Sequence, residues 1–523
     1  MIRPQTQTKE YWVDDFQITE ADVEQIYNHL LEVEVPQTTQ QLAHIVFTHR
    51  VNEERNRLAQ KMSSRKMYQP KNSYEVGDEL IFPALKFKAG VVKAIRDGYN
   101  PQDGQFDVLQ VEINGKEREF AATLTQEHVL NLTDNHPTEV FDEIDVDELL
   151  AQFGEAVMAT LYEKLDSMED FVHLAQLWYV KALMVDINIG HLHLSEAVLE
   201  MHEGGALSTD EIMVHLDMDP RLKPAAVRFS LDYALLKDER FDEVAPAEEI
   251  AWFLRRMQPD EVQTPPEKLV YEKIHYDNAL LGPHLRLLIQ ELDDEWSDLT
   301  ALKRDVGKCH LIYPHRLEGT LPLNARMRSL FPLGTSPHQQ YTLIDRKADE
   351  KIPVWVVQEH RYVYGLRDWY KSEGIPIGAE ITISKGPKAD TLYLDYERRK
   401  GQKEWVRLAS VADGQIKFEH KRRSVSAGFD DLLIVGTDFI AALDMMWRKM
   451  STRTLAKLIA IVLPPLAELN PQNTVHSKTL YSAINMLRRV PPEPLFAELV
   501  RHPAFEAVGD DYWRFNHQRW QGE

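Results

Sequence analysis

A long run of short strand-like segments separated by turn residues, residues 307–437, is the feature that most limits how this chain can fold. In these segments, β-branched and aromatic residues alternate with polar ones, a pattern that is typical of half-buried strands. One segment, GLRDWYKSEG, instead has the spacing of a short helix. Many strands around one short helix predict a closed or half-closed β-barrel.

The N-terminal part of the chain changes from a helical period to a strand period. Apolar residues recur at helical spacing in residues 17–68, where Thr19 is a candidate N-cap with Asp22 at the capping-box position. We expect three short helices here, the second of which begins at Thr39, and this is the outline of a helix-turn-helix. From Tyr74 onward, short β-type runs are separated by glycines and predict a small, SH3-like, antiparallel barrel of about five strands.

Two further stretches follow the order of three helices and then two strands. Residues 147–190 are strongly apolar and we expect them to be helical, including FVHLAQLWYVKALMVDINIG. After them, HLSEAVLEMHEG, STDEIMVHLDM and PAAVRFSLDYALLKD predict three helices, and ERFDEVAPAEEIAWFLRRM predicts a strand pair. The C-terminal segment repeats this order and ends in AFEAVGDDYWRFN. Three helices followed by a β-hairpin are typical of a winged helix.

The predicted fold is therefore α+β and multidomain, with winged-helix modules and two barrels. The expected domains are a helix-turn-helix or winged helix at residues 17–70, a small SH3-like β-barrel at 71–135, a helical segment plus a winged helix at 147–258, the larger β-barrel at 307–437 and a C-terminal winged helix at 450–517.

The charge of the chain is unevenly distributed. With 60 Lys and Arg against 83 Asp and Glu, the formal net charge is −23, which disfavours non-specific attraction to phosphate backbones. Binding depends on the local surface and not on the sum, however. From Lys385 to Arg423 there are eleven Lys or Arg and only six Asp or Glu, which makes this the most basic stretch of the chain.

Cysteine content and hydropathy indicate where the protein resides. The single cysteine, Cys309, cannot form an internal disulfide, which favours a reducing cytoplasm. The N-terminus has no apolar signal-peptide core. The longest apolar run, near Leu455–Leu466, contains Lys457 and two prolines and is too short to span a bilayer. We therefore expect a cytoplasmic protein without membrane contact.

Motifs of known enzyme classes are missing from the sequence. It contains no GxxxxGK[ST], GxGxxG, GxSxG or HExxH pattern. Cys309, His310 and His315 lie close together, but nothing completes a metal-ligand set around them. A faint resemblance to a nuclease strand pair lacks the lysine that would follow the acid, and involves Asp390, Asp395, Glu397 and Arg399. We therefore expect no enzyme, no metal and no cofactor.

The two predicted strand pairs resemble the wing of HARE-type winged helices. In that family an F-x-x-V-G-x-x-x-W hairpin follows the third helix, and FEAVGDDYWRF is similar to it. DERFDEVAPAEEIAWFL resembles the same wing but has Ala245 and Pro246 where the family pattern has glycine. The resemblance implies modules that bind DNA or another protein.

The β-rich block resembles the B3-like DNA-binding pseudobarrel family. The matching segments occur in the family order from Cys309 to Ile383, and are CHLIYPHRLE, GTLPLNARMRSLFP, YTLID, VWVV, QEHRYVYGLRDWYKSEG and IPIGAEITI. In that family the second segment is a strand and a small helix that ends in Phe-Pro and closes one barrel end. The flanking loops form two arms that grip the major groove of DNA.

Mapped onto this chain, the resemblance places one arm at Tyr313, His315, Arg316 and Glu318 and the other at Glu359, His360, Arg361 and Tyr362. Arginine can make two hydrogen bonds to one guanine base, and His or Tyr can donate a hydrogen bond to phosphate. The candidate DNA-contacting residues of the block are His315, Arg316, Arg326, Arg328, His360, Arg361, Tyr362, Arg367, Lys421, Arg422 and Arg423, and those of the first helix-turn-helix are Arg55, Lys61 and Arg65.

Each of these residues also has a simpler interpretation. The arginines of the arms can pair with nearby acids such as Glu318, Glu359 and Asp368, and the KRR cluster can be a solvated turn. Two functions therefore stay open. One is sequence-specific binding of double-stranded DNA, in transcription regulation or in defence against foreign DNA. The other is a non-catalytic scaffold that binds a basic protein or RNA polymerase, since HARE-type modules are acidic and resemble part of the delta subunit of bacterial RNA polymerase.

Overall fold

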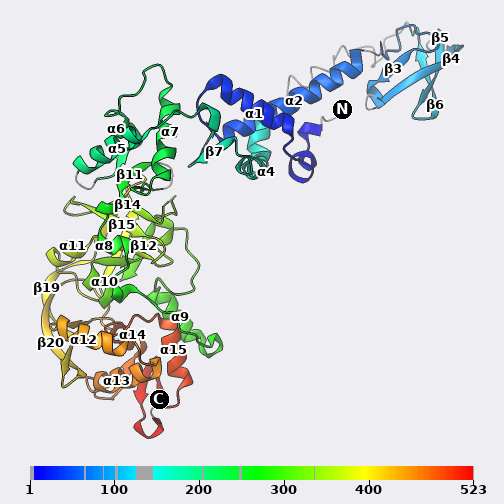
Figure 1. Ribbon diagram of the computed structural model, residues 1–523. Coiled ribbons are helices and arrows are strands. Elements are labelled where there is room, and N and C mark those ends of the chain that lie inside the picture. The colour runs from blue at the N-terminus through cyan, green and yellow to red at the C-terminus, as the bar shows by residue number, and fades with distance from the viewer. Residues whose placement is uncertain are drawn as a thin grey trace. The chain divides into compact units, whose positions relative to one another are not determined.

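The computed structural model describes residues 5–63, 66–85, 88–100, 104–124, 145–202, 205–246, 250–334 and 336–521. The chain divides into two compact units, Met1–Asp186 with Asp219–Ser230 and Ile187–Met218 with Leu231–Glu523. Both contain helices and β-sheets, so the predicted α+β class is confirmed (Figure 1).

The helical part of the first unit is built on three helices and a three-stranded sheet. The helices are α1 (Glu20–Val33), α2 (Thr39–Ser63) and α4 (Val146–Asp166), and the strands β1 (Gln37–Thr38), β7 (Phe171–Leu174) and β8 (Leu177–Val180) are ordered β1-β8-β7. The predicted cap of α1 is confirmed, because Thr19 and Asp22 form a reciprocal capping box. Buried Ile26, Phe47 and Leu161 lie in one core that all three helices share.

Two sequence-based predictions for this part were wrong. The two helices expected from Thr39 onward are a single helix, α2, of 25 residues. The run FVHLAQLWYV forms the antiparallel hairpin β7–β8 and not a helix, with Phe171 opposite Val180. A short run of apolar residues fits a buried helix and a buried strand equally well, so its periodicity does not decide between them.

A five-stranded sheet is inserted between α2 and α4. Its strands are β2 (Lys66–Met67), β3 (Glu79–Phe82), β4 (Lys88–Asn100), β5 (Gly104–Ile113) and β6 (Lys116–Ala122), ordered as in the sequence, and only β2 pairs in parallel. Asn114 and Gly115 connect β5 to β6 and both have positive φ, which is the geometry of a type I′ hairpin turn. The expected strand-rich domain of about five strands is therefore present.

The second unit begins with a helical module whose sheet has the order β10-β11-β9. Its elements are α5 (Ile189–Met201), β9 (Leu207–Ser208), α6 (Thr209–Met213), the part of α7 (Pro224–Lys237) from Leu231 onward, β10 (Phe241–Glu243) and β11 (Ala251–Leu254). The expected strand pair around residue 246 is thereby confirmed. Phe253 packs edge-on against Trp355 of the following barrel, so module and barrel share a core cluster.

The barrel is a seven-stranded, nearly closed sheet ordered β12-β17-β18-β14-β15-β16-β13. Its strands are β12 (Val306–His310), β13 (Thr320–Pro322), β14 (His338–Asp345), β15 (Lys351–Val357), β16 (Tyr362–Tyr364), β17 (Glu380–Lys385) and β18 (Thr391–Tyr396). Two short helices accompany it, α10 (Tyr313–Glu318) and α11 (Arg367–Ser372), as does a 3-10 turn at Arg328–Leu330. β14 and β18 pair in parallel, and the other neighbours are antiparallel.

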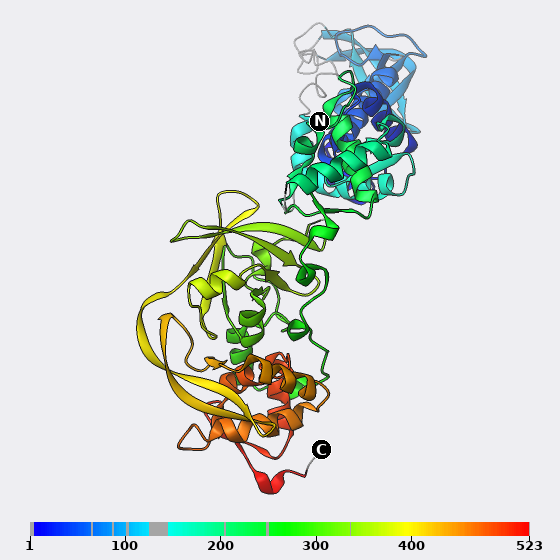
Figure 2. The same ribbon diagram turned by 60° about the vertical axis from the view of Figure 1, so that its left-hand side comes forward.

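The expectation of one barrel spanning residues 307–437 is corrected by the sheet pairing. β19 (Arg398–Ala412), β20 (Gln415–Ala427) and β21 (Val435–Thr437) form a separate sheet in the order β20-β19-β21. β19 and β20 make a long curved hairpin that arches from the barrel to the C-terminal helices (Figure 2). Near its turn, Ile416 and Phe418 belong to the same core cluster as residues of those helices.

The C-terminal part contains four helices and a small sheet. The helices are α12 (Ile440–Met450), α13 (Leu455–Ala467), α14 (Ser477–Ile484) and α15 (Pro492–Arg501), and β22 (Val475–His476), β23 (Phe505–Gly509) and β24 (Tyr512–Phe515) are ordered β22-β24-β23. A segment before the barrel, α9 (Pro283–Leu292), packs in the same core. No helix in the described residues has the length and apolar character that a membrane crossing needs.

The three small sheets share one arrangement of a tryptophan and a helix start. In each sheet, a tryptophan of the strand that comes last in the sequence pairs with a residue of the short strand before a helix. The pairs are Gln37 with Trp178, Leu207 with Trp252, and Val475 with Trp513. Two residues after Gln37, Leu207 and Val475, the chain has a Thr, a Thr and a Ser. The indole N–H then donates to the first hydroxyl of the next helix, at 3.0 Å (Trp178 to Thr39), 3.1 Å (Trp252 to Thr209) and 2.9 Å (Trp513 to Ser477). The three modules are therefore built to the same plan.

A buried ion cluster joins the C-terminal helices to the barrel. Arg489 Nη2 lies 2.6 Å from both carboxylate oxygens of Asp294 and 2.7 Å from Glu295 Oε1, and all three side chains are fully buried. His315 of α10 also reaches Glu295, at 3.2 Å. Burial alone would raise the pKa of Glu295, but the charges of Arg489 and His315 hold it well below its usual range.

Candidate nucleic-acid interface

The segment predicted as the first DNA-binding arm is the short helix α10 and not a loop. Pro314 lies in the first turn of α10, and Gly319 ends the helix at a positive φ of 74°, where a Cβ would come within 2.5 Å of Arg367. His315 is 1% exposed and contacts Thr320 Oγ1 at 2.8 Å as well as Glu295. Its side chain is therefore enclosed and presents no group to an external ligand.

The second predicted arm is also turned toward the protein. Tyr362 is fully buried, and its hydroxyl donates to the carbonyl of Glu261. Arg361 donates to the carbonyl of Glu295 at 2.8 Å and lies 5.0 Å from the ring centroid of Trp296. His360, which precedes both of them in the turn, is half-exposed. Of the candidates in this arm, Tyr362 is removed from solvent and His360 is not.

The other candidate arginines of the barrel region donate mainly to backbone carbonyls. Arg316 reaches Ile375, Arg326 reaches Gln290, and Arg328 reaches Glu295. The remaining one, Arg367, is exposed and pairs with Glu318 at 3.3 Å, which is the surface ion pair that the sequence left as an alternative. Arginines that donate to carbonyls in this way fix loops of the barrel region in place, and such use reduces what they can offer to DNA.

The candidates of the first helix-turn-helix lie on or after α2. Arg55 is half-exposed on this helix. Lys61 belongs to its last turn, where only the backbone is described, and Arg65 lies outside the described residues. Their DNA contact stays a prediction.

The β19–β20 hairpin carries a local charge opposite to that of the rest of the chain. Residues 398–427 contain nine Lys or Arg and three Asp or Glu, a net charge of +6, whereas the remainder of the chain carries −29. The hairpin closes at Asp413 and Gly414, which both have positive φ as a type I′ turn requires. The turn sets the register, so each residue of β19 from Gln402 to Ala412 has a defined partner across the hairpin, and a bulge interrupts the pairing between Arg398 and Gln402.

This register divides the hairpin into two faces, because successive side chains of a strand point to opposite sides. We call the side formed by Lys403, Trp405, Arg407, His420 and Arg422 the outer face; Trp405 lies opposite Arg422, and Arg407 lies opposite His420. The inner face includes Val406, Leu408, Lys421, Arg423 and Val425. Its apolar members pack with Ile434 in a small core cluster.

Trp405 stands out on the outer face because its large apolar side chain is 59% exposed. The guanidinium carbon of Arg422 lies 5.2 Å from its ring centroid, and the ring of His420 lies at 6.4 Å in an edge-on arrangement. Lys403, which lies two residues before Trp405 on the same face of β19, is exposed. An exposed aromatic ring between cations can stack on a base while the cations contact phosphates.

Burial adjusts the ionisation of the other two groups of the outer face. The pKa of His420 is lowered, mainly by partial burial and additionally by the charge of Arg407. Partial burial also lowers the pKa of Arg407, whose Nη1 donates to the carbonyl of Asp431 at 2.5 Å. His420 is therefore biased toward its neutral form, and the positive charge of the face rests on Lys403, Arg407 and Arg422.

The KRR cluster that the sequence singled out does not act as one patch. Residues 421 and 423 lie on the inner side, where both pair with Asp438. Only Arg422 lies on the outer face. Strand geometry, with its period of two, separates three cations that the sequence places in a row.

The root of the hairpin is anchored to the barrel. Arg398, at the start of β19, donates to both carboxylate oxygens of the buried Asp345, at 2.9 and 2.8 Å. Trp369 of α11 donates to the same carboxylate at 2.8 Å. This charge-assisted contact, made by Nη2 to both oxygens, ties the start of β19 to the barrel.

The sequence-based interpretation missed Trp405 and found Arg422 only as part of a cluster. The signal was present as an alternation, Trp405 and Arg407 on one strand and His420 and Arg422 on the next, on either side of an Asp-Gly turn. The chain matches no protein-family model and no curated protein, and it matches no solved structure.

Proposed function

We propose that this protein binds DNA and that the outer face of the β19–β20 hairpin is its main contact surface. The observation that carries the proposal is the exposed Trp405 beside Arg422, in a segment of charge +6 within an acidic chain. Acids elsewhere repel phosphates and so favour one orientation of the protein on DNA.

An exposed tryptophan favours DNA that offers at least one accessible base face. Stacking on an aromatic side chain contributes about 1–3 kcal/mol per base and does not depend strongly on sequence. Lys403 and Arg422 flank the ring and supply contacts to the backbone. The preferred ligand is therefore a single strand, or a duplex with an unpaired or end base.

The modular architecture supports a DNA-binding role. The shared plan of the three small sheets is compatible with winged helices, the seven-stranded sheet with a B3-like pseudobarrel, and the five-stranded sheet with an SH3-like barrel. In this proposal the modules add duplex contacts beside the hairpin. Among the candidate residues of the barrel, His360 of the second predicted arm and Arg367 have the exposure that such contacts need.

A second candidate function, a scaffold for a basic protein, is favoured by one observation. The part of the chain outside residues 398–427 carries a charge of −29, which attracts a basic partner and repels DNA. In that case the acidic surfaces and not the hairpin would carry the interaction. The two functions are separated by which variants lose binding.

Fluorescence anisotropy with labelled DNA tests the proposal directly. The probes are a random-sequence duplex, its single strand and the same duplex with one unpaired base, each titrated with the full chain at two salt concentrations. We expect the single strand and the duplex with an unpaired base to bind more tightly than the perfect duplex, and all three to weaken at the higher salt. Absence of binding to all three probes at low salt would leave the scaffold as the better account.

A further inference from the structure

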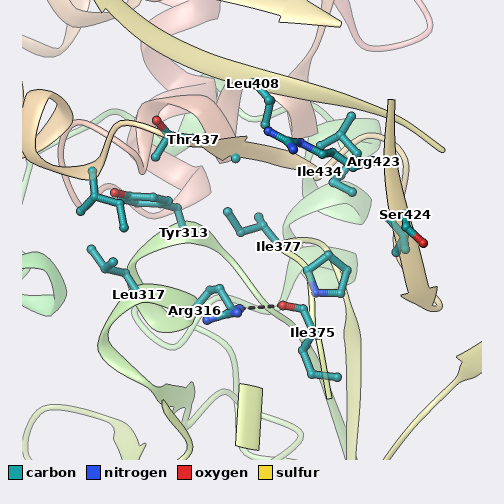
Figure 3. A pocket seen from close by; sticks show the side chains of 16 residues that line it. Tyr313, Arg316, Leu317, Ile375, Ile377, Leu408, Arg423, Ser424, Ile434 and Thr437 are labelled. Atoms are coloured by element: carbon teal, nitrogen blue, oxygen red, sulfur yellow. Dashed lines mark hydrogen bonds between the residues drawn. The ribbon is translucent and has the colours of Figure 1, made fainter. Parts of the chain in front are cut away.

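A cavity of about 330 Å³ lies on the inner face of the same hairpin. It is open to solvent on one side and is lined by α10, the loop at residues 374–377, the hairpin and residues 434–440 (Figure 3). Ligand pockets in proteins have volumes of roughly 300 Å³ and more. At about 30 Å³ for each water-sized group, this space holds a molecule with on the order of ten non-hydrogen atoms.

Most of the cavity wall is apolar. The aliphatic side chains of Leu317, Ile377, Leu408, Val425 and Ile434 contribute to it. They come from α10, the loop after α11, the β19–β20 hairpin and the segment just before β21. An alkyl or ring body of a ligand would gain about 25 cal/mol for each square ångström of apolar surface that it buries there.

Arg316 supplies a cation at this wall without a carboxylate to balance it. Its Nε donates to the carbonyl of Ile375 at 2.6 Å and Nη2 to the carbonyl of Tyr370 at 3.3 Å, and its guanidinium carbon lies 5.5 Å from the ring centroid of Tyr370 (Figure 3). Among the described residues, no Asp or Glu oxygen comes within 4.0 Å of it, and Nη1 donates to no acceptor.

The environment of Arg316 favours the arrival of an anion. The side chain is half-buried, and burial lowers the pKa of this arginine below its ordinary value. A partly desolvated cation without a counter-charge is unfavourable, and an anion that enters the cavity would remove that penalty. Nη1 and the second N–H of Nη2 can donate hydrogen bonds to such an anion.

A second guanidinium at the cavity is already neutralised. Arg423 lines the wall from β20, but its charge is paired with Asp438. The cavity therefore offers one unbalanced positive charge and not two. One charge and apolar walls fit a singly charged carboxylate better than a dianionic phosphate.

We propose that this cavity binds a small monocarboxylate with an apolar body, with Arg316 as the partner of the carboxylate. The alkyl or ring part lies against Ile377, Leu408 and Ile434, and the carboxylate lies at the Arg316 end. The proposal does not depend on DNA binding, since its residues belong to the inner face and to the barrel.

Calorimetric titration of the full chain with octanoate tests this proposal, with octan-1-ol and octyl phosphate as comparison ligands. We expect octanoate to bind and octan-1-ol to bind at least about tenfold more weakly, because only the carboxylate accepts charge-assisted hydrogen bonds from the guanidinium. Equal binding of octanoate and octan-1-ol would overturn the role of Arg316. Tighter binding of octyl phosphate would overturn the carboxylate assignment, and no binding of octanoate would overturn the site.

Two variants and one matched control locate the ligand. Arg316→Gln is expected to weaken octanoate binding at least about tenfold. Arg328→Gln is the control, because Arg328 is also half-buried and donates only to backbone carbonyls but does not line the cavity. Ile377→Trp fills the cavity while Arg316 is retained, and is expected to abolish binding even if Arg316→Gln fails to fold. Unchanged affinity in Ile377→Trp would place the ligand elsewhere and contradict the proposal.

Discussion

The guanidinium of Arg422 lies over the ring of Trp405, 5.2 Å from its centroid, across one register pair of the β19–β20 hairpin. This contact places a cation beside a large aromatic side chain that is 59% exposed. Such a pair contributes about 0.5–1 kcal/mol at an exposed site, which is little for the stability of the fold. The exposure of Trp405 is better explained by a ligand that binds it than by packing.

The salt dependence of DNA binding should show how many cations of the outer face contact phosphates. Substituting Lys403→Ala removes one phosphate contact, so the slope of log K against log salt should become less steep by about 0.9 for duplex DNA or about 0.7 for a single strand. The measurement is a series of anisotropy titrations at increasing NaCl concentration. Lys371→Ala, an exposed lysine of α11, is the control and should leave the slope unchanged. Identical slopes for all three proteins would exclude Lys403 from the interface.

The tryptophan and hydroxyl pairs of the three modules should each contribute to stability. Ser477→Ala leaves the buried indole N–H of Trp513 without its acceptor at 2.9 Å, and we expect a loss of about 1–3 kcal/mol in the free energy of unfolding. Ser451→Ala, at an exposed serine after α12, is the control. The measurement is chemical denaturation followed by circular dichroism. In Trp513→Phe the same serine substitution should cost much less, and an equal cost would show that the hydrogen bond is not the cause.

Arg489 should be among the most sensitive positions of the second unit. Arg489→Met removes the counter-charge of the buried Asp294 and Glu295, and we expect the free energy of unfolding to fall by about 3–5 kcal/mol. Its neighbour Arg488 donates only to the carbonyl of Arg453 and is the matched control. Denaturation midpoints of the two variants provide the comparison. A cost for Arg489→Met no larger than that for Arg488→Met would mean that the cluster does not hold α14 and α15 to the barrel region.

The ionisation of Glu493 should make the free energy of unfolding depend on pH. Burial, with the nearby charge of Asp294 in addition, raises its pKa from 4.5 to about 7. Below pH 4.5 the carboxyl is protonated in the folded and unfolded states alike. Between pH 4.5 and about 7 the unfolded chain releases the proton while the folded chain keeps it, so the free energy of unfolding falls as pH rises, by about 3 kcal/mol in total.

The variant Glu493→Gln isolates this effect, because its amide does not titrate. We expect it to match the parent protein near pH 4 and to be about 3 kcal/mol more stable at pH 8. Denaturation curves at several pH values measure the difference. A difference that stays constant from pH 4 to pH 8 would show that Glu493 does not carry this ionisation.

The sequence predicted helices and strands correctly where a single local signal, such as a helix cap or a turn, decides the structure. Thr19 and Asp22 gave the start of α1, and the strand pairs of the second and third modules followed from alternation beside a turn. The helix α10 was missed because the resemblance placed residues 313–318 in a loop of the first arm and Gly319 in the following strand segment, although Pro314 and Gly319 are a first-turn proline and a C-terminal glycine. The split of the β-rich block into two sheets depends on pairings between distant strands, which no local pattern contains.

The candidate site could be predicted only in part, for the same reason. The basic character of residues 385–423 is visible in composition, but the separation of Arg422 from its two neighbours follows from the register that the turn at Asp413 sets. The enclosure of His315 and Tyr362 depends on Glu295 and Glu261, which come from segments before the barrel. Sequence identifies which groups are available, and long-range packing decides which of them face solvent.

One measurement tests the central claim most directly, namely the dissociation constant of single-stranded DNA for the double variant Trp405→Ala/Arg422→Ala beside the parent chain. Arg514→Ala, an exposed arginine of β24 paired with Glu506, is the control for loss of charge. Loss of a stacking platform and one phosphate contact predicts a dissociation constant that rises at least tenfold in the double variant, in line with about 1–3 kcal/mol for the stacked base alone, and no more than slightly in the control. Equal affinity of the parent chain and the double variant would show that DNA, if bound, does not contact the outer face of the hairpin.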